Sequence, residues 1–446
     1  MMLLTALRFA GRGTVCIRCG LAAMLICVSA LTTLADDWPQ FRGAERDNTS
    51  RESGLLASWP EAGPALAWKF GNAGVGYSSP SIVDGRLYLT GSRDGRTELF
   101  CLKAEDGAEL WSLPINETPF DFEGNAWGAG PRATPTVDGD LIYALAGDGQ
   151  LVCATTGGEV KWKLHMVDDL KGSIKGVDAG EPETVGWGFC WGPVVDGDQL
   201  ICTPGSINGE GLVVALEKTT GKVLWRSAEL DEESTYASPV VATLAGVKQY
   251  VVMTQYGIAS VSAEDGKKLW YYERSRPYSD VVIPTPVCHD DHVYASTGDG
   301  CELISVGKDS SGGFMVEEVY TSRNMKNSIG GFVLHDGHIY GTSERRGWVC
   351  QEFMTGDLSW YQRPNKSVGN GSIIMADGNL YLYGERSAEV ALVEVSTEAW
   401  NEKGRFALPE SSKLTAASGK NWTRPVIADG KLYLRDQDLL FCYQIK

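Results

Sequence analysis

The feature that most constrains the fold of this chain is a short pattern that recurs along it. A glycine-containing turn precedes a run with a tryptophan, as in EDGAELWSL (105–113), TTGKVLWRS (219–227), EDGKKLWYY (264–272) and MTGDLSWYQ (354–362). A small residue stands nine or ten positions before these tryptophans and before Trp162; these small residues are Cys101, Cys153, Ala215, Ser260 and Cys350. Recurrence of one motif indicates a repeat architecture, in which each unit buries its apolar surface against its neighbours.

A second recurring pattern consists of two apolar runs joined by a turn that usually contains Asp-Gly, which is a strong signal for a β-hairpin. Six copies place a tyrosine eight residues after a proline, phenylalanine or isoleucine; these are Tyr88, Tyr143, Tyr294, Tyr340, Tyr381 and Tyr433. Because side chains alternate between the two faces of a strand, an even step puts both residues on one face. We therefore predict one packing position for the tyrosine in every unit. Two weaker copies, at 192–202 and 238–252, carry Ile201 and a longer turn respectively.

Together the two patterns predict a four-stranded antiparallel unit, and the hairpins indicate eight units. Eight such sheets around one axis form an all-β, eight-bladed β-propeller. The run ALAWKF (65–70) has no hairpin of its own, so we predict that this N-terminal strand joins the last blade and closes the ring. Closure removes exposed sheet edges. The fifth unit, with KDSSGGFMVEEVY (308–320), has no tryptophan, and the seventh ends at Trp400, so a seven-bladed ring with an irregular insert is the alternative.

The first 35 residues have the pattern of an export signal. Three arginines precede the apolar run LAAMLICVSALTTLA, which has 15 residues and ends at Ala35. A membrane-spanning helix needs roughly 20 apolar residues. We expect a signal peptide over 1–35, a single propeller domain over 36–446, and a location in the periplasm or cell envelope. No cysteine of this leader follows the small residue that lipid attachment requires, so we expect no lipid anchor.

The composition is acidic, with 40 Lys and Arg, 57 Asp and Glu, and a formal charge of −17. The leader holds three of the arginines and no acidic residue, which leaves 37 basic side chains and a charge of −20. Nucleic-acid binding depends on a basic surface that neutralises phosphates, so we exclude nucleic acid as a partner. We expect a soluble monomer with no transmembrane segment after the leader.

The segments CLKAEDGAELW, ALEKTTGKVLW and SVSAEDGKKLW resemble the PQQ-like β-propeller repeat, whose units carry an inner strand, a small residue and then Gly-x-x-x-Trp. The start DDWPQFRG (36–43), followed by GYSSPSIVDGRLY (76–88), is similar to a group of exported bacterial members. The resemblance covers nearly the whole mature chain and implies the propeller fold. It leaves the function open, because one fold hosts many activities.

Two branches of this family imply different functions. The quinoprotein dehydrogenases hold pyrroloquinoline quinone (PQQ) over calcium, and membership would imply adjacent disulfide-bonded cysteines, a stacked tryptophan, calcium ligands and an Asp base. The other branch is similar to the propeller lipoprotein of the outer-membrane β-barrel assembly machine, which docks proteins and performs no chemistry. The chain has no Cys-Cys pair. We therefore predict no cofactor and no metal, with PQQ and calcium as the alternative.

The remaining cysteines and histidines have structural interpretations. Four cysteines share one inner-strand position and are predicted to be small core residues; they are Cys101, Cys153, Cys350 and Cys442. A disulfide between Cys190 and Cys202, in the third hairpin, is left open. The histidines of HDDH (289–292) and HDGH (335–338) flank turns whose equivalents in other units share no chemistry, so we interpret them as exposed turn residues rather than metal ligands.

Two sets of residues are candidates for a binding site on one face of the ring. The long connections 116–135 and 172–193 should form a rim, with the aromatic residues Phe120, Trp127, Trp187 and Trp191. The segments just before the inner strands should line the mouth of the channel, with Tyr77, Arg132, Tyr236, Asn327, Asn370, Trp422 and Arg424. Rim aromatics form either a recognition surface or a cover for blade edges. Arg132 and Arg424 either hold an anionic ligand or peptide carboxylate, or pair with a nearby Asp or Glu.

The sequence thus predicts an exported, non-catalytic propeller that binds an envelope protein, a peptide or a small ligand at the face with the long connections. A ring suits this task because it holds loops from eight units around one depression. The alternative is a PQQ- and calcium-dependent oxidoreductase that acts on alcohols or sugars. We predict no catalytic residue for the platform function.

Overall fold

The Asp-Gly turns have the conformation that a two-residue hairpin requires. In the first hairpin, Asp84 and Gly85 have φ angles of 50° and 70°, and in the last, Asp429 and Gly430 have φ angles of 54° and 65°. Two consecutive positive φ angles form the turn whose twist matches that of the paired strands. Glycine adopts such angles freely and aspartate tolerates them better than most residues. The local sequence therefore determines where each inner hairpin reverses.

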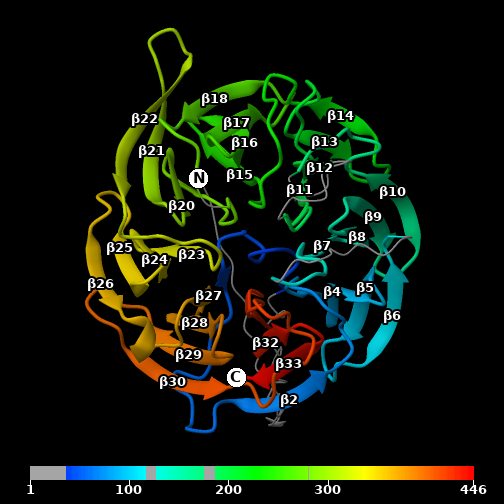
Figure 1. Ribbon diagram of the computed structural model, residues 1–446, viewed down its shortest axis with the longest axis vertical. Helices are drawn as coiled ribbons and strands as arrows, with labels where there is room; N and C mark the ends of the chain where they lie inside the picture. Colours follow the sequence, from blue (N-terminus) through cyan, green and yellow to red (C-terminus); the bar gives the residue numbers. More distant parts are fainter. Residues whose placement is uncertain (1–36, 117–126, 175–185, 280) are drawn as a thin grey trace, which may run out of the picture. The chain divides into compact units, whose positions relative to one another are not determined.

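The computed structural model describes residues 37–116, 127–174, 186–279 and 281–446. Contacts divide the chain into Met1–Leu34, which lies outside the described residues, and the unit Ala35–Lys446. The described residues of this second unit form eight sheets; seven have four antiparallel strands, and one has four antiparallel strands and a fifth, parallel strand. The sheets stand around a common centre (Figure 1). The eight-bladed propeller is therefore confirmed, and the seven-bladed alternative is wrong.

The first four blades follow one another along the chain. Blade 1 contains β3 (Ser81–Val83), β4 (Arg86–Arg93), β5 (Arg96–Lys103) and β6 (Glu109–Pro114). Blade 2 contains β7 (Thr136–Asp138), β8 (Leu141–Leu145), β9 (Gln150–Thr155) and β10 (Val160–His165). Blade 3 contains β11 (Val194–Asp196), β12 (Gln199–Cys202), β13 (Val214–Glu217) and β14 (Val223–Arg226). Blade 4 contains β15 (Val240–Leu244), β16 (Val247–Met253), β17 (Gly257–Ser262) and β18 (Lys268–Glu273).

The last four blades complete the ring. Blade 5 contains β19 (Val287–His289), β20 (His292–Thr297), β21 (Gly300–Lys308) and β22 (Phe314–Ser322). Blade 6 contains β23 (Phe332–His335), β24 (His338–Ser343), β25 (Gly347–Glu352) and β26 (Leu358–Gln362), followed by the short 3-10 helix η1 (Pro364–Lys366). Blade 7 contains β27 (Gly371–Ala376), β28 (Asn379–Gly384), β29 (Glu389–Glu394) and β30 (Glu402–Ala407). Blade 8 contains β31 (Val426–Ala428), β32 (Lys431–Asp436), β33 (Leu439–Gln444) and β2 (Ala65–Phe70).

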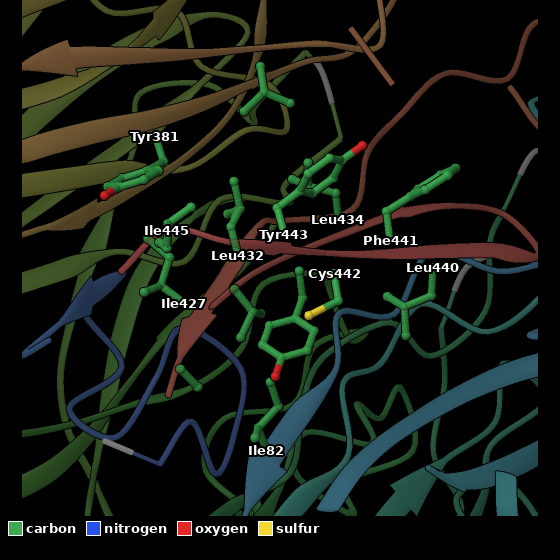
Figure 2. Close-up of a cluster of buried hydrophobic side chains, with 14 of the residues drawn as sticks. Ile82, Tyr381, Ile427, Leu432, Leu434, Leu440, Phe441, Cys442, Tyr443 and Ile445 are labelled. Atoms are coloured by element: carbon green, nitrogen blue, oxygen red, sulfur yellow. The ribbon is translucent and has the colours of Figure 1, made fainter. Parts of the chain in front are cut away.

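Blade 8 is built from both ends of the chain. The N-terminal strand β2 pairs antiparallel with β33, with Trp68 opposite Cys442. This pairing confirms the predicted closure of the ring. Successive side chains of β33 point to opposite faces of the blade 8 sheet, with Cys442 on one face and Tyr443 on the other (Figure 2). The buried cluster around them therefore joins blades 7, 8 and 1.

The residues at the repeated positions are buried as predicted. The six repeated tyrosines are each at most 1% exposed. The four small-position cysteines Cys101, Cys153, Cys350 and Cys442 are fully buried and free. Cys190 and Cys202 are also free, so the third hairpin contains no disulfide. The side chain of His289 is 53% exposed and lies 3.3 Å from Asp290, which agrees with a turn residue.

The glycine of Gly-x-x-x-Trp receives the tryptophan of the preceding blade. Gly221 of blade 3 has a φ of +74°, and a Cβ built on it would lie 2.9 Å from the Trp162 ring of blade 2. Gly266 of blade 4 has a φ of +75°, and its Cβ would lie 2.3 Å from the Trp225 ring of blade 3. Both the close contact and the positive φ exclude a side chain. The motif therefore fastens blade 3 to blade 2 and blade 4 to blade 3.

Blade 5 uses a tyrosine in place of the missing tryptophan. Tyr320 lies opposite Leu303 in the register of β21 and β22. A Cβ built on Gly356 of blade 6 would lie 2.7 Å from the Tyr320 ring, so the contact between blades is kept. The hairpin of β21 and β22 projects beyond the ring (Figure 1, upper left).

Blade 7 takes its missing tryptophan from a distant part of the chain. The position opposite Leu392 is Gly404, and a Cβ built there would lie 2.6 Å from the Cβ of Trp59. The Trp59 ring lies 5.8 Å from the ring of Tyr381, the repeated tyrosine of this blade, and 5.2 Å from that of Phe406. The backbone amide of Trp59 donates a hydrogen bond to Lys403 at 3.0 Å. Trp59 therefore completes blade 7 from the N-terminal segment.

The residues 37–50, which we call the axial segment, run through the middle of the ring (Figure 1, dark blue). Trp38 exchanges two backbone hydrogen bonds of 2.8 Å with Ile82 of blade 1. The Asn48 side chain donates to the carbonyl oxygen of Phe332, in blade 6, at 3.0 Å. The short strand β1 (Thr49–Ser50) pairs parallel with β27 of blade 7. The axial segment therefore crosses the central channel from blade 1 to blades 6 and 7.

Candidate functional site

A cavity of about 300 Å³ lies where the segments before the inner strands converge on the axis. Seven of the blades contribute to its lining, and the axial segment adds Phe41. The lining residues are Phe41, Tyr77, Trp127, Arg132, Trp187, Cys190, Tyr236, Val281, Ile283, Ser328, Ile329, Glu344, Lys420, Trp422 and Arg424. We call this space the axial cavity. Convergence of many blades on one point is the property that makes a propeller centre a suitable binding site.

Aromatic rings form two walls of the axial cavity. Trp422 lies 5.4 Å from Tyr77 and 6.0 Å from Trp127, measured between ring centroids. The Tyr77 hydroxyl donates to the carbonyl oxygen of Trp127 at 2.9 Å, which ties these two blades together. On the other side, Trp187 meets Tyr236 edge to face at 5.5 Å. The rings provide apolar surface, and only a few side chains are available for polar contacts with a ligand.

Arg132 is held in the cavity by backbone carbonyls and one ring. Its two terminal nitrogens donate to Gly130 at 2.9 Å and to Gly128 at 2.7 Å. The guanidinium lies 4.7 Å from the centre of the Tyr77 ring, a favourable cation–π geometry. Burial lowers the pKa of Arg132, while the nearby Cys190 acts in the opposite direction. Arginine side chains are in effect always protonated in proteins, so Arg132 carries a positive charge.

Arg424 faces the axial segment. Its guanidinium lies 4.6 Å from the centre of the Phe41 ring, and it donates to the carbonyl oxygen of Ile329 at 3.2 Å. The buried Nε of Arg424 has no hydrogen-bond partner within the described residues. Burial lowers its pKa to about 9, and the positive charge of Arg42 contributes to the shift. Arg424 therefore also carries its charge at neutral pH.

The two arginines form no ion pair with any Asp or Glu that the structure describes. In the described part of the chain, no Asp or Glu oxygen lies within 4.0 Å of either guanidinium. The third cation of the lining, Lys420, does have a partner, since it pairs with Glu385 at 2.8 Å. Within the described residues, neither Arg132 nor Arg424 therefore forms an ion pair, and both of the possibilities left by the sequence stay predictions.

A second, more polar cavity of about 250 Å³ adjoins the first. The two share Ser328, Ile329, Glu344, Lys420 and Trp422. The residues that belong only to the second cavity are Lys326, Gly330, Thr342, Arg345, Asn370, Gly371, Ser372, Glu385, Arg386 and Asn421. We call this space the polar cavity. Together the two spaces form one site with an apolar end and a polar end.

The structure brings most of the predicted site residues together. Tyr77, Trp127, Arg132, Trp187, Tyr236, Trp422 and Arg424 line the axial cavity, and Asn370 lines the polar cavity. Trp191 does not reach either space, because it is fully buried and packs edge to face on Phe189 at 6.3 Å. Asn327 is also fully buried. Its side-chain amide donates to the carbonyl oxygen of Gly331 at 2.8 Å and accepts from the backbone N–H of Gly331 at 3.0 Å. Phe120 lies outside the described residues.

Several lining residues were not predicted from the sequence. Lys420 could have been found, since it alternates with Trp422 and Arg424 along one segment and faces the same way. Cys190 belongs to a connection that was recognised only for its tryptophans. Phe41 gave no signal, because nothing in the local pattern indicates that the axial segment enters the channel.

Three solved structures resemble this fold. BamB from Moraxella catarrhalis has a TM-score of 0.56 at 14% identity, over 83% of this chain and 94% of that one. Quinohemoprotein alcohol dehydrogenase from Comamonas testosteroni has a TM-score of 0.62 at 11% identity, over 92% and 80%. The computationally designed Ika8 protein has a TM-score of 0.56 at 9% identity, over 85% and 100%. At these identities, the similarity shows the fold alone.

Comparisons of the sequence assign the chain to a family. A comparison with curated protein sequences gives no match. In the part of the chain that the structure describes, no helix has the length and apolar character to cross a membrane. A family model described as outer membrane protein assembly factor BamB matches residues 52–168 and 95–362, which together make up more than half of the chain. The chain, a PQQ-like β-propeller, therefore belongs to the BamB family.

Proposed function

We propose that this protein is an exported, non-catalytic binding platform that takes up an organic anion in the axial cavity. The observation that carries the proposal is the pair of guanidiniums, Arg132 and Arg424, which line an aromatic cavity and have no acidic partner among the described residues. Withdrawing a charge from water costs free energy unless an opposite charge or several hydrogen bonds compensate. A carboxylate between the two arginines would provide both.

The shape and chemistry of the cavity restrict the ligand. A volume of about 300 Å³ is at the lower end for ligand sites. The rings of Tyr77, Trp187 and Trp422 favour an apolar group next to the anionic one. Because the family description names an outer membrane protein assembly factor, we propose that an envelope protein supplies the anionic group. We also propose that the propeller itself is a monomer and acts in the periplasm.

The cavity does not fit the calcium that a quinoprotein function would require. Calcium takes about six to eight oxygen ligands. The carboxylate of the lining, Glu344, accepts a hydrogen bond from Ser328 at 2.5 Å, and the two arginines oppose a cation. Within the described residues, no group of three or more His, Cys, Asp or Glu side chains is placed to hold a metal ion. We therefore propose no cofactor for this site.

The test uses 3-phenylpropanoate, which combines one carboxylate with one ring, and its neutral amide. We expect the acid to bind, as measured by quenching of tryptophan fluorescence, with an affinity at least about tenfold higher than that of the amide, because only the acid can form ion pairs with the guanidiniums. Arg132→Gln and Arg424→Gln should each weaken binding of the acid by about tenfold or more. Arg132→Lys should lose part of this affinity, because lysine keeps the charge and loses the two-pronged geometry.

The matched control is Arg96→Gln, which removes an exposed arginine at the start of β5. Its affinity for 3-phenylpropanoate should equal that of the unmodified protein. Equal affinity for acid and amide would contradict the proposal. So would a quinone absorbance spectrum with alcohol-dependent dye reduction after addition of PQQ and calcium.

A further inference from the structure

The two adjoining cavities offer complementary chemistry in a fixed order. The axial cavity provides the cations Arg132 and Arg424 together with apolar rings. The polar cavity provides amides and backbone next to it, across the shared residues Lys420 and Trp422. A ligand that fills both spaces therefore has an anionic and apolar end, followed directly by a polar portion. The rest of this argument depends on the anion site proposed above.

One polar atom of the second cavity lacks a partner. The buried side-chain oxygen of Asn370 accepts no hydrogen bond from any described residue. Asn370 lines the polar cavity, just before β27 of blade 7. A buried acceptor without a donor is costly, and an N–H group from a ligand would satisfy it. The backbone N–H of a peptide is a donor of this kind.

The carboxylates around the polar cavity are already engaged. Glu385 accepts from Lys420 at 2.8 Å and from the indole nitrogen of Trp422 at 3.3 Å. Glu344 accepts from Ser328 at 2.5 Å. These carboxylates therefore hold the walls in place and leave Asn370 as the acceptor for a ligand.

The floor of the axial cavity favours binding of the end of a peptide over binding of an internal segment. Phe41 lines the cavity under the Arg424 guanidinium, and the axial segment around it spans the channel from blade 1 to blade 6. A peptide that enters this cavity cannot continue through the ring. Its last residue presents a carboxylate and a side chain on one Cα atom, which matches a cavity where arginines alternate with rings.

We propose that the site captures the free carboxyl end of a peptide with an apolar last residue. The terminal carboxylate lies between Arg132 and Arg424, and the last side chain packs against the aromatic rings. The preceding backbone N–H groups reach the polar cavity, where Asn370 accepts one of them. An internal Asp or Glu fits less well, because its carboxylate stands on the side chain and the Cα then carries no apolar group.

The test measures fluorescence anisotropy with N-terminally labelled pentapeptides and the full protein. A peptide that ends in phenylalanine with a free carboxylate should bind at least about tenfold more tightly than its amide, and than a peptide that ends in glycine. Asn370→Ala should weaken peptide binding about three- to tenfold and leave 3-phenylpropanoate binding unchanged. The matched control Asn72→Ala removes an exposed asparagine and should change neither affinity.

The outcomes separate this inference from the function on which it depends. If 3-phenylpropanoate binds in an Arg132-dependent manner but the free-acid peptide binds no better than its amide, the capture of a chain end is refuted and the anion site stands. If neither probe binds, both proposals fail. If Asn370→Ala weakens both probes equally, the proposed contact with the peptide backbone is wrong.

Discussion

Replacing Trp59 by alanine should reduce the free energy of unfolding by about 3–5 kcal/mol, the range for truncation of a large buried aromatic side chain. Trp59 is only 7% exposed and supplies the ring that blade 7 itself lacks. Its removal leaves Gly404 facing an empty space, since this strand has no side chain there to fill it. The rings of Tyr381 and Phe406 would each lose an aromatic neighbour. Chemical denaturation monitored by circular dichroism gives the free energy.

Trp127→Ala is the matched control for this experiment. Trp127 is 40% exposed, so the same truncation should cost clearly less. Relative to the unmodified protein, the Trp59→Ala protein should show a larger increase in amide hydrogen-exchange rate in β30 than in blades 3 and 4. A change in unfolding free energy below about 1 kcal/mol would show that Trp59 does not substitute for the missing tryptophan.

Gly266→Ala should destabilise the protein by about 2–4 kcal/mol, through a backbone cost and a collision. The φ angle of Gly266 is +75°, and the new methyl group would lie 2.3 Å from the Trp225 ring of the preceding blade. Gly246→Ala separates these two costs. Gly246 has the same φ of +75° with no atom within 4 Å of its Cβ position, so alanine there costs only the backbone part, about 1 kcal/mol.

The difference between the two glycine variants measures the contact between blades. Unfolding free energies should differ by at least about 1 kcal/mol, the lower end for overpacking in a core. Equal values for the two variants would mean that the Trp225 ring moves aside freely. The glycine would then be required only for its backbone conformation.

Local patterns predicted most of this fold because a propeller repeats local contacts. The step of eight to Tyr88 and its equivalents, and the glycine before each tryptophan, reflect contacts within a blade or with the next one. The exception is blade 7, where the expected tryptophan is replaced by Gly404 and the ring comes from Trp59, far away in the sequence. A pattern within one repeat cannot reveal a partner from outside it.

The site was predicted to the extent that position in the repeat determines it. Residues before the inner strands reach the axis, and this rule placed Tyr77, Arg132 and Arg424 around one space. The rule does not say which way a side chain turns, and Trp191 turns into the core between blades 2 and 3. It is also silent on Phe41, whose place depends on contacts between the axial segment and distant blades.

The pairing of β2 with β33 has a consequence for how the chain matures. Strand β2 has to wait for Leu439–Gln444, which is synthesised much later, before it acquires its partner in the sheet. Contacts of such long sequence separation form slowly. Until that moment blade 8 lacks this pairing and the ring stays open, so closure of the ring is a late step in folding.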